Sequence, residues 1–157
     1  MKSEPVLKGR MLREREGMKF LSYVDPSVPF KDGKADVNQI LVIGKNGRVV
    51  GRTGFVETKD GGARLFIGRT PDGTKSRLDI SVTGVEQHSG VGTEMMRDLI
   101  GLAREKKLTR LSIVGAVPSA VPFYEKALNN LKESGHVVSF SKLFRKDMDD
   151  YCFSVKI

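Results

Sequence analysis

Two closely spaced glycines, Gly90 and Gly92, stand where backbone groups could bind a phosphate. Directly after them, apolar residues recur every three or four positions, which predicts an amphipathic helix that ends near Lys106. The first N–H groups of a helix lack an intrahelical acceptor and lie at the positive end of its dipole, so they attract anions. Because glycine has no Cβ, an anion can approach the main chain closely. These residues predict an anion site at the start of the helix.

Two common phosphate loops do not fit this segment. A dinucleotide-binding loop would place a third glycine at position 95, where the sequence has Met95. A nucleoside-triphosphate loop would continue with lysine and then serine or threonine, but Thr93 and Glu94 follow Gly92. A tight turn into a packed helix would also explain the glycine pair, so spacing alone leaves a purely structural role open.

The segment before this helix has the alternation and turn signals of strands. Residues 39–43 are an apolar run, and residues 48–57 return as a second strand after an Asn-Gly turn. Further turns lead into strands at 63–68 and 76–82, so we expect an antiparallel meander of these four segments. Nearer the N-terminus, residues 11–20 suggest a short helix.

After the glycine loop and its helix, the sequence predicts a strand at 111–114, a second helix that contains Tyr124, and strands at 136–144 and 150–157. Together the parts predict an α/β (α+β) fold with a mixed, mostly antiparallel central sheet flanked by helices. With 157 residues, of which 39% are hydrophobic, the chain is expected to form one domain over residues 1–157.

The charge and hydropathy of the chain limit what it can bind and where in the cell it is expected. The net charge is +8, from 27 Lys and Arg against 19 Asp and Glu, which favours anionic partners. Because the basic residues are spread along the chain, a solvated surface explains them better than a nucleic-acid face. No apolar stretch is long enough to cross a membrane, and the charged start lacks the core of a signal peptide, so a cytoplasmic protein is expected. The lone Cys152 cannot form an internal disulfide.

The segment ISVTGVEQHSGVG resembles the acetyl-coenzyme A motif of the GNAT superfamily of N-acetyltransferases. That motif reads apolar-x-Val, a linker, Arg or Gln, and then x-x-Gly-x-Gly or Ala. Its places are filled here by Ile80, Val82, Gln87, Gly90 and Gly92. Downstream, residues 111–114 match the family's next strand, and the sequence AVPFYEK matches its Ala-x-x-aromatic-Tyr-Glu-Lys helix. The resemblance covers residues 78–128.

This resemblance implies two diverging strands that form a groove for acetyl-coenzyme A. The main chain near Ile80 and Val82 would bind the pantetheine arm, and the glycine loop would bind the pyrophosphate. The loop residues implied are Gln87, His88, Ser89, Gly90, Val91, Gly92 and Thr93. The resemblance further implies direct transfer of the acetyl group to an amine in a ternary complex, without an acyl-enzyme. Two His and one Cys are not expected to form a metal site.

Three residues are candidates for proton transfer. By resemblance, Tyr124 would be the general acid that protonates the departing thiolate, although its place on an apolar stripe also suits a core residue. A base must take the proton of the amine, and Asp79 or Glu57 could do so unless each is only a solvated strand residue. His88 is a further proton acceptor by residue type, but loop histidines are more often simply exposed.

The sequence departs from the family in several places. Val117 replaces the Asn that usually binds the pantetheine arm, and Gln87 replaces the commoner Arg. The two helices that commonly shape the acceptor pocket are reduced to one in this interpretation, with an added strand pair around residues 64–73. A non-catalytic module on an anionic partner is therefore the alternative to an enzyme. For an enzyme, the basic exterior disfavours polycationic acceptors, leaves small amines or protein amino groups, and leaves a homodimer open.

Overall fold

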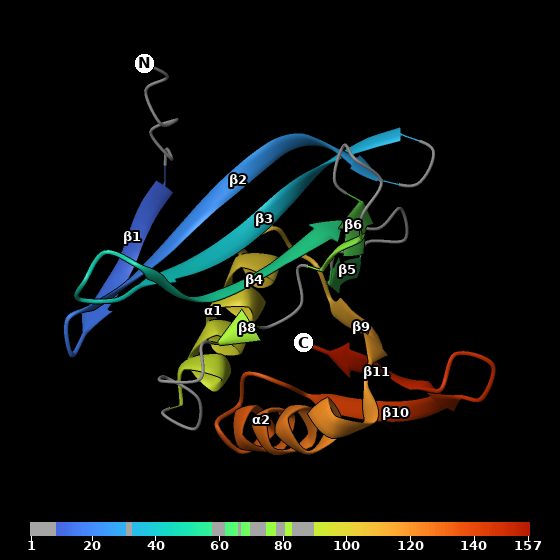
Figure 1. Ribbon diagram of the computed structural model, residues 1–157. Coiled ribbons are helices and arrows are strands. Elements are labelled where there is room, and N and C mark those ends of the chain that lie inside the picture. Colours follow the sequence, from blue (N-terminus) through green and yellow to red (C-terminus); the bar gives the residue numbers. More distant parts are fainter. Residues whose placement is uncertain are drawn as a thin grey trace.

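The computed structural model describes residues 9–30, 33–57, 62–65, 67–69, 75–77, 81–82 and 90–157 (Figure 1). The part up to Val82 contains the strands β1 Gly9–Arg15, β2 Met18–Phe30, β3 Gly33–Ile43, β4 Val49–Glu57, β5 Gly62–Leu65, β6 Ile67–Arg69, β7 Lys75–Arg77 and β8 Ser81–Val82. The rest contains helix α1 Val91–Glu105, strand β9 Arg110–Ala116, the 3-10 helix η1 Pro118–Ala120, helix α2 Val121–Glu133, and strands β10 Ser139–Arg145 and β11 Asp150–Lys156.

The strands form a large mixed sheet and a small hairpin. In the large sheet the order is β1-β2-β3-β4-β5-β9-β11-β10, and β8 also pairs with β4. Its neighbours are antiparallel except β5 and β9, which are parallel. The small sheet is the hairpin of β6 and β7. Figure 1 shows α1 beside β4 and α2 beside β10 and β11. The predicted mixed, mostly antiparallel sheet with flanking helices is confirmed.

The N-terminal strands correct one expectation. Residues 11–20 are not helical, because β1 and β2 form an antiparallel hairpin there. Its turn consists of Glu16 and Gly17, whose φ angles of 52° and 79° match the twist of a tight hairpin. In β2 the buried Phe20 has less buried neighbours on both sides, which is the period of a strand. The described residues before α1 contain no helix. The expectation of one acceptor-side helix in this part of the chain is therefore wrong as well.

The predicted hairpin at the Asn-Gly pair is confirmed. β3 and β4 are antiparallel, and the Gly44 N–H donates to Arg48 O at 2.8 Å across the turn. The Arg48 N–H donates to Asn46 Oδ1 at 3.1 Å, and Gly47 has a φ of 78°, which glycine adopts without strain. The predicted C-terminal strand pair is also confirmed, as β10 and β11.

The middle of the chain differs from a simple meander, because two short strands share one edge of β4. β5 pairs with the last residues of β4, whereas β8 pairs with Gly51 and Arg52. The predicted strand 63–68 is therefore divided between β5 and β6, and the predicted strand 76–82 between β7 and β8. Among the described strands, β5 connects β4 to β9 in the large sheet.

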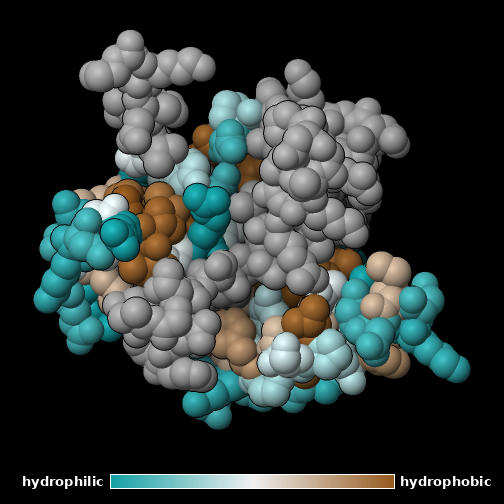
Figure 2. Space-filling view, viewed as in Figure 1, coloured by the Kyte–Doolittle hydropathy of each residue, from teal (hydrophilic) through white to brown (hydrophobic). Residues whose placement is uncertain are grey.

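An apolar cluster lies between the sheet and the two helices. The stripe predicted for α1 is buried and consists of Val91, Met95, Met96, Leu99, Ile100 and Ala103. The first turns of α1 approach β4 at Gly51, where an added Cβ would lie only 3.0 Å from Met95 Sδ. The glycine thus permits close contact between helix and strand. Figure 2, in the same view, shows mostly hydrophilic residues toward the left and right outline of this face and hydrophobic residues nearer its middle.

Candidate functional site

The start of α1 has the geometry of an anion site. Gly90 is the N-cap residue, has a left-handed φ of 88°, and is exposed to solvent. The helix's first hydrogen bond runs from the Glu94 N–H to Gly90 O at 3.0 Å. Within the described residues, the N–H groups of Val91, Gly92 and Thr93 have no acceptor. Three adjacent donors at the positive end of a helix dipole can therefore bind an anion.

A left-handed N-cap explains why glycine stands at position 90. A Cβ on Gly90 would meet no heavy atom within 4 Å, so available space does not require the glycine. The positive φ does, because an L side chain is strained in that conformation. Of the other loop residues predicted from the sequence, Gln87, His88 and Ser89 lie outside the described residues, as do Asp79 and Ile80.

Beside this helix start, the large sheet opens between β8 and β9. The register of β9 with β5 begins at Arg110 and ends at Ser112, while β9 itself continues to Ala116 along β11. β8 pairs through Val82 with Gly51 of β4, and in the described part of the chain it has no pairing with β9. Strands β8 and β9 thus diverge where the predicted groove was expected, and β8 also lies against α1.

Tyr124 belongs to the first turn of α2 and lies in the apolar cluster. Tyr124 is only 4% exposed, and the centroid of its ring is 5.3 Å from that of Phe123 and 5.6 Å from that of Phe153. Aromatic pairs at these separations pack favourably. The phenol ring is therefore held in one place by α2 and β11.

Glu57 lies at the other end of α1. Its Oε1 is 3.6 Å from Lys106 Nζ, and both side chains are well exposed. Lys106 caps the C-terminal end of α1, whereas Gly90 caps its N-terminal end. The 15 residues of this helix span about 22 Å. The structure therefore does not bring Glu57 together with the helix start.

A polar group on the opposite face of the sheet was not predicted. Tyr23 donates to Gln39 Oε1 at 2.8 Å, and Gln39 Nε2 lies 3.5 Å from Asp25 Oδ2. The pKa of Tyr23 is raised, mainly by burial; the charge of Arg52 lowers it, and the charge of Asp25 raises it by a smaller amount. Alternation along β2 sets Tyr23 and Asp25 on the face opposite Phe20, which belongs to the apolar cluster. Alternation along β2 is the sequence signal that could have indicated this group.

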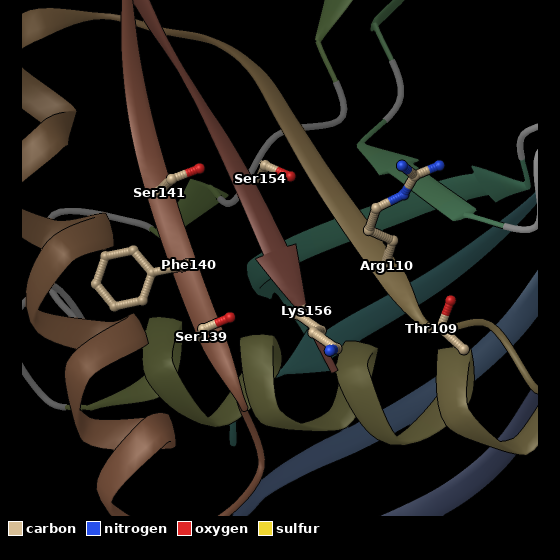
Figure 3. A pocket seen from close by; sticks show the side chains of 7 residues that line it. All are labelled: Thr109, Arg110, Ser139, Phe140, Ser141, Ser154 and Lys156. Carbon is tan, nitrogen blue, oxygen red and sulfur yellow. The ribbon is translucent and has the colours of Figure 1, made fainter.

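A cavity of about 520 Å³ opens on the C-terminal strands, away from the divergence of β8 and β9. Its lining comes from Thr109, Arg110, Ser139, Phe140, Ser141, Ser154 and Lys156. Figure 3 shows the serine hydroxyls on one side of the strands and the Phe140 ring pointing the other way, toward α2. The cavity lies at the start of β9, and no residue predicted for the site lines it. We therefore locate the candidate site at the start of α1.

Two further properties concern the residues that the structure describes. There, no three His, Cys, Asp or Glu side chains come together as a metal-binding group. Among the same residues, none of the helices is both long enough and apolar enough to cross a membrane.

Comparison with known proteins gives a consistent result. Residues 11–129 match the model of the acetyltransferase (GNAT) family. A search of curated proteins returned no match. Among solved structures, the GNAT-family acetyltransferase of Staphylococcus aureus Mu50 has a TM-score of 0.55 at 12% identity, covering 76% of this chain and 68% of that one. Nourseothricin acetyltransferase has a TM-score of 0.51 at 15% identity, covering 90% and 86%. Tetrahymena GCN5 has a TM-score of 0.50 at 13% identity, covering 77% and 68%. At these identities the structures support the fold.

Proposed function

The chain belongs to the acetyltransferase (GNAT) family, and from this premise we propose that it transfers an acetyl group from acetyl-coenzyme A directly to a primary amine. The observation that carries the proposal is the start of α1. Gly90 is left-handed there, and three successive N–H groups have no acceptor in the described part of the chain. A pyrophosphate needs such a row of donors.

The coenzyme would be bound by the main chain on both sides of this helix start. The N–H groups of residues 87–93 would bind the pyrophosphate, and glycines 90 and 92 would let it come close. Main-chain groups near Ile80 and Val82 would bind the pantetheine arm. The divergence of β8 from β9 supports this assignment, because a strand edge that lacks a neighbouring strand offers main-chain donors and acceptors to a ligand.

In the proposed reaction the amine nitrogen bonds to the thioester carbonyl carbon as the carbon–sulfur bond breaks. Acetyl-coenzyme A supplies the thioester. Tyr124 would donate its phenolic proton to the departing sulfur, and its fixed ring supports this role, since positioning is a large part of such catalysis. Its hydroxyl would be restored by a proton from solvent.

The base that takes the amine proton is proposed to be Asp79, directly or through water. Asp79 precedes Val82 by three residues, so it would be near the groove. The other candidate, Glu57, is paired with Lys106 beside the opposite end of α1. That pairing favours Asp79 over Glu57.

The acceptor is proposed to be a small amine or a protein amino group. A net charge of +8 disfavours an acceptor that carries several positive charges. β2 ends at Phe30 and β3 begins at Gly33, so only two residues separate the strands. A connection this short leaves no room for acceptor-side helices between β2 and β3, which favours an acceptor that needs little enclosure.

Val117 favours a second candidate, a binding module with this fold but without catalysis. It occupies the place where the family usually carries an Asn toward the pantetheine arm, and it is 38% exposed at the start of η1. An apolar side chain cannot make that hydrogen bond. Such a module would bind an anionic partner through its basic exterior.

Calorimetry with acetyl-coenzyme A separates the two candidates. We expect a saturable binding heat at micromolar coenzyme, and then release of thiol when a panel of amines and peptides is added. No heat at high micromolar coenzyme would reject the enzyme in favour of the binding module. Binding without turnover on any acceptor of the panel would favour a module that keeps the coenzyme.

A further inference from the structure

An ionic cluster connects the edge strand β1 to the first half of α1. Arg13 Nη2 lies 2.9 Å from Glu94 Oε2, and Arg13 Nη1 lies 2.6 Å from Asp98 Oδ1. Arg15 Nε lies 2.6 Å from Glu94 Oε1, as an ion pair without hydrogen-bond alignment. Both carboxylate oxygens of Glu94 therefore face a guanidinium from β1.

Arg13 is fixed in this cluster by more than its carboxylate partners. Its guanidinium carbon lies 4.2 Å from the centroid of the Phe20 ring, which is fully buried. The side chains of Arg13, Glu94 and Asp98 are 26%, 21% and 10% exposed. Burial lowers the pKa of Arg13, but its hydrogen bonds to Asp98 and Glu94 and the charges of these carboxylates outweigh burial, so the pKa is raised overall. Partly buried pairs are screened by salt less than surface pairs.

The position of Glu94 gives this cluster a consequence for ligand binding. Glu94 is in the first turn of α1 and directly follows Thr93, the last of the three donors that have no acceptor among the described residues. A carboxylate in a first turn is attracted by the same N–H groups that would bind a phosphate. It also repels a diphosphate, because like charges at short range destabilise each other. An unpaired Glu94 would therefore oppose an anion at this helix start.

We propose that Arg13 and Arg15 are positioning residues of the coenzyme site. They hold the Glu94 carboxylate against β1 and neutralise its charge, so that the N–H groups at the start of α1 stay open to a diphosphate. This inference rests on the proposed function, since it assigns the diphosphate of a coenzyme to that helix start.

The chain provides a matched control. Arg10 of the same strand pairs with Glu105 of the same helix at 3.3 Å, and both side chains are 59% exposed. Glu105 is the last residue of α1, so this pair lies at the opposite helix end from Gly90. Arg10→Gln removes a similar ion pair between β1 and α1 without changing the charge near the proposed site.

The test measures the Kd of coenzyme A by calorimetry, and the melting temperature, for the full chain and four variants. We expect Arg13→Gln to weaken binding about fivefold, and Arg13→Gln with Glu94→Gln to return to within twofold of the parent. Glu94→Gln alone should bind at least as tightly as the parent, and Arg10→Gln should bind like it. The loss of coenzyme affinity in Arg13→Gln should be smaller at 1 M salt, where charges more than about 3 Å apart are largely screened from each other.

A merely structural tether predicts different signs. If the cluster only holds α1 in place, Glu94→Gln should weaken binding, and the double variant should be no better than Arg13→Gln. Either result overturns the inference, as does parent-like binding by a folded Arg13→Gln. If Arg13→Gln does not fold, weaker binding by Glu94→Gln decides against the inference, and equal or tighter binding supports it. A parent chain that binds no coenzyme A would overturn the proposed function as well.

Discussion

The two helices begin in opposite ways, although both are amphipathic and both pack on the same apolar cluster. α1 begins after a left-handed Gly90, and its first three N–H groups have no acceptor in the described residues. α2 follows the 3-10 helix η1, where the Ala120 N–H donates to Val117 O at 2.9 Å, and Pro122 in its first turn has no N–H. The start of α1 is therefore suited to an anion, and the start of α2 is not.

The two helices are also held to the sheet by different kinds of contact. Charged groups hold the first half of α1 to β1, through the carboxylates of Glu94 and Asp98. Aromatic rings hold the first turn of α2, where Tyr124 contacts Phe123 and Phe153. Under the proposed function, α1 would bind the charged part of a ligand, and α2 would hold the reactive hydroxyl of Tyr124 in a dry environment.

Removing the Tyr124 hydroxyl should sharpen this division most. We expect Tyr124→Phe to lower turnover about 100-fold, because general acid catalysis is lost, while the Kd of acetyl-coenzyme A stays within twofold. Thiol release and calorimetry measure the two quantities, and a melting curve checks the fold. Unchanged turnover would show that α2 supplies packing alone and that the acid lies elsewhere.

A side chain at the α1 N-cap should have the next largest effect. In Gly90→Ala the left-handed backbone is strained, so the free energy of unfolding should fall by about 1 kcal/mol, and coenzyme binding should weaken as the loop shifts. Gly101→Ala is the control, since Gly101 is exposed within the same helix and a Cβ there meets nothing within 4 Å. It should raise the free energy of unfolding by about 0.5–1 kcal/mol. Denaturant unfolding distinguishes these signs, and equal effects would contradict the distinct role of position 90.

A change in the strand beneath α1 should affect stability and leave coenzyme binding unchanged. Thr53 is fully buried in β4, and among the described residues its Oγ1 has no hydrogen-bond partner. Thr53→Val replaces this hydroxyl by a methyl group of similar size, so it should raise the free energy of unfolding by about 1 kcal/mol. Coenzyme binding should be unchanged, which chemical denaturation and calorimetry can check. A loss of stability would mean that the Thr53 hydroxyl is hydrogen-bonded in solution, and that the contact between α1 and β4 contains a polar interaction.

The parts of the fold that the sequence predicted correctly depend on local signals. The stripe from Val91 to Ala103 repeats with the period of a helix, and the Asn-Gly turn between β3 and β4 has its own backbone preference. The helix start at Gly90 is local in the same sense, because only residues close in sequence determine it. These features remain visible without knowledge of the rest of the chain.

The parts that the sequence missed depend on distant residues. The hairpin of β1 and β2 turns at Glu16 and Gly17, and a glutamate with positive φ is not a usual turn signal. Arg13 and Glu94 are 81 residues apart, so their ion pair follows from the sheet order and has no motif. The division of one β4 edge between β5 and β8 likewise requires the tertiary structure.

The most direct test of the central claim is an amide chemical-shift titration of the ¹⁵N-labelled chain with acetyl-coenzyme A. We expect saturable shifts that are largest for the N–H groups of Val91, Gly92 and Thr93 and small for the first turn of α2. Pantetheine, which lacks the diphosphate, should leave those three signals near their free positions. Binding of acetyl-coenzyme A that leaves them unmoved, with the main shifts instead at the cavity formed by Arg110 and Lys156, would contradict the account.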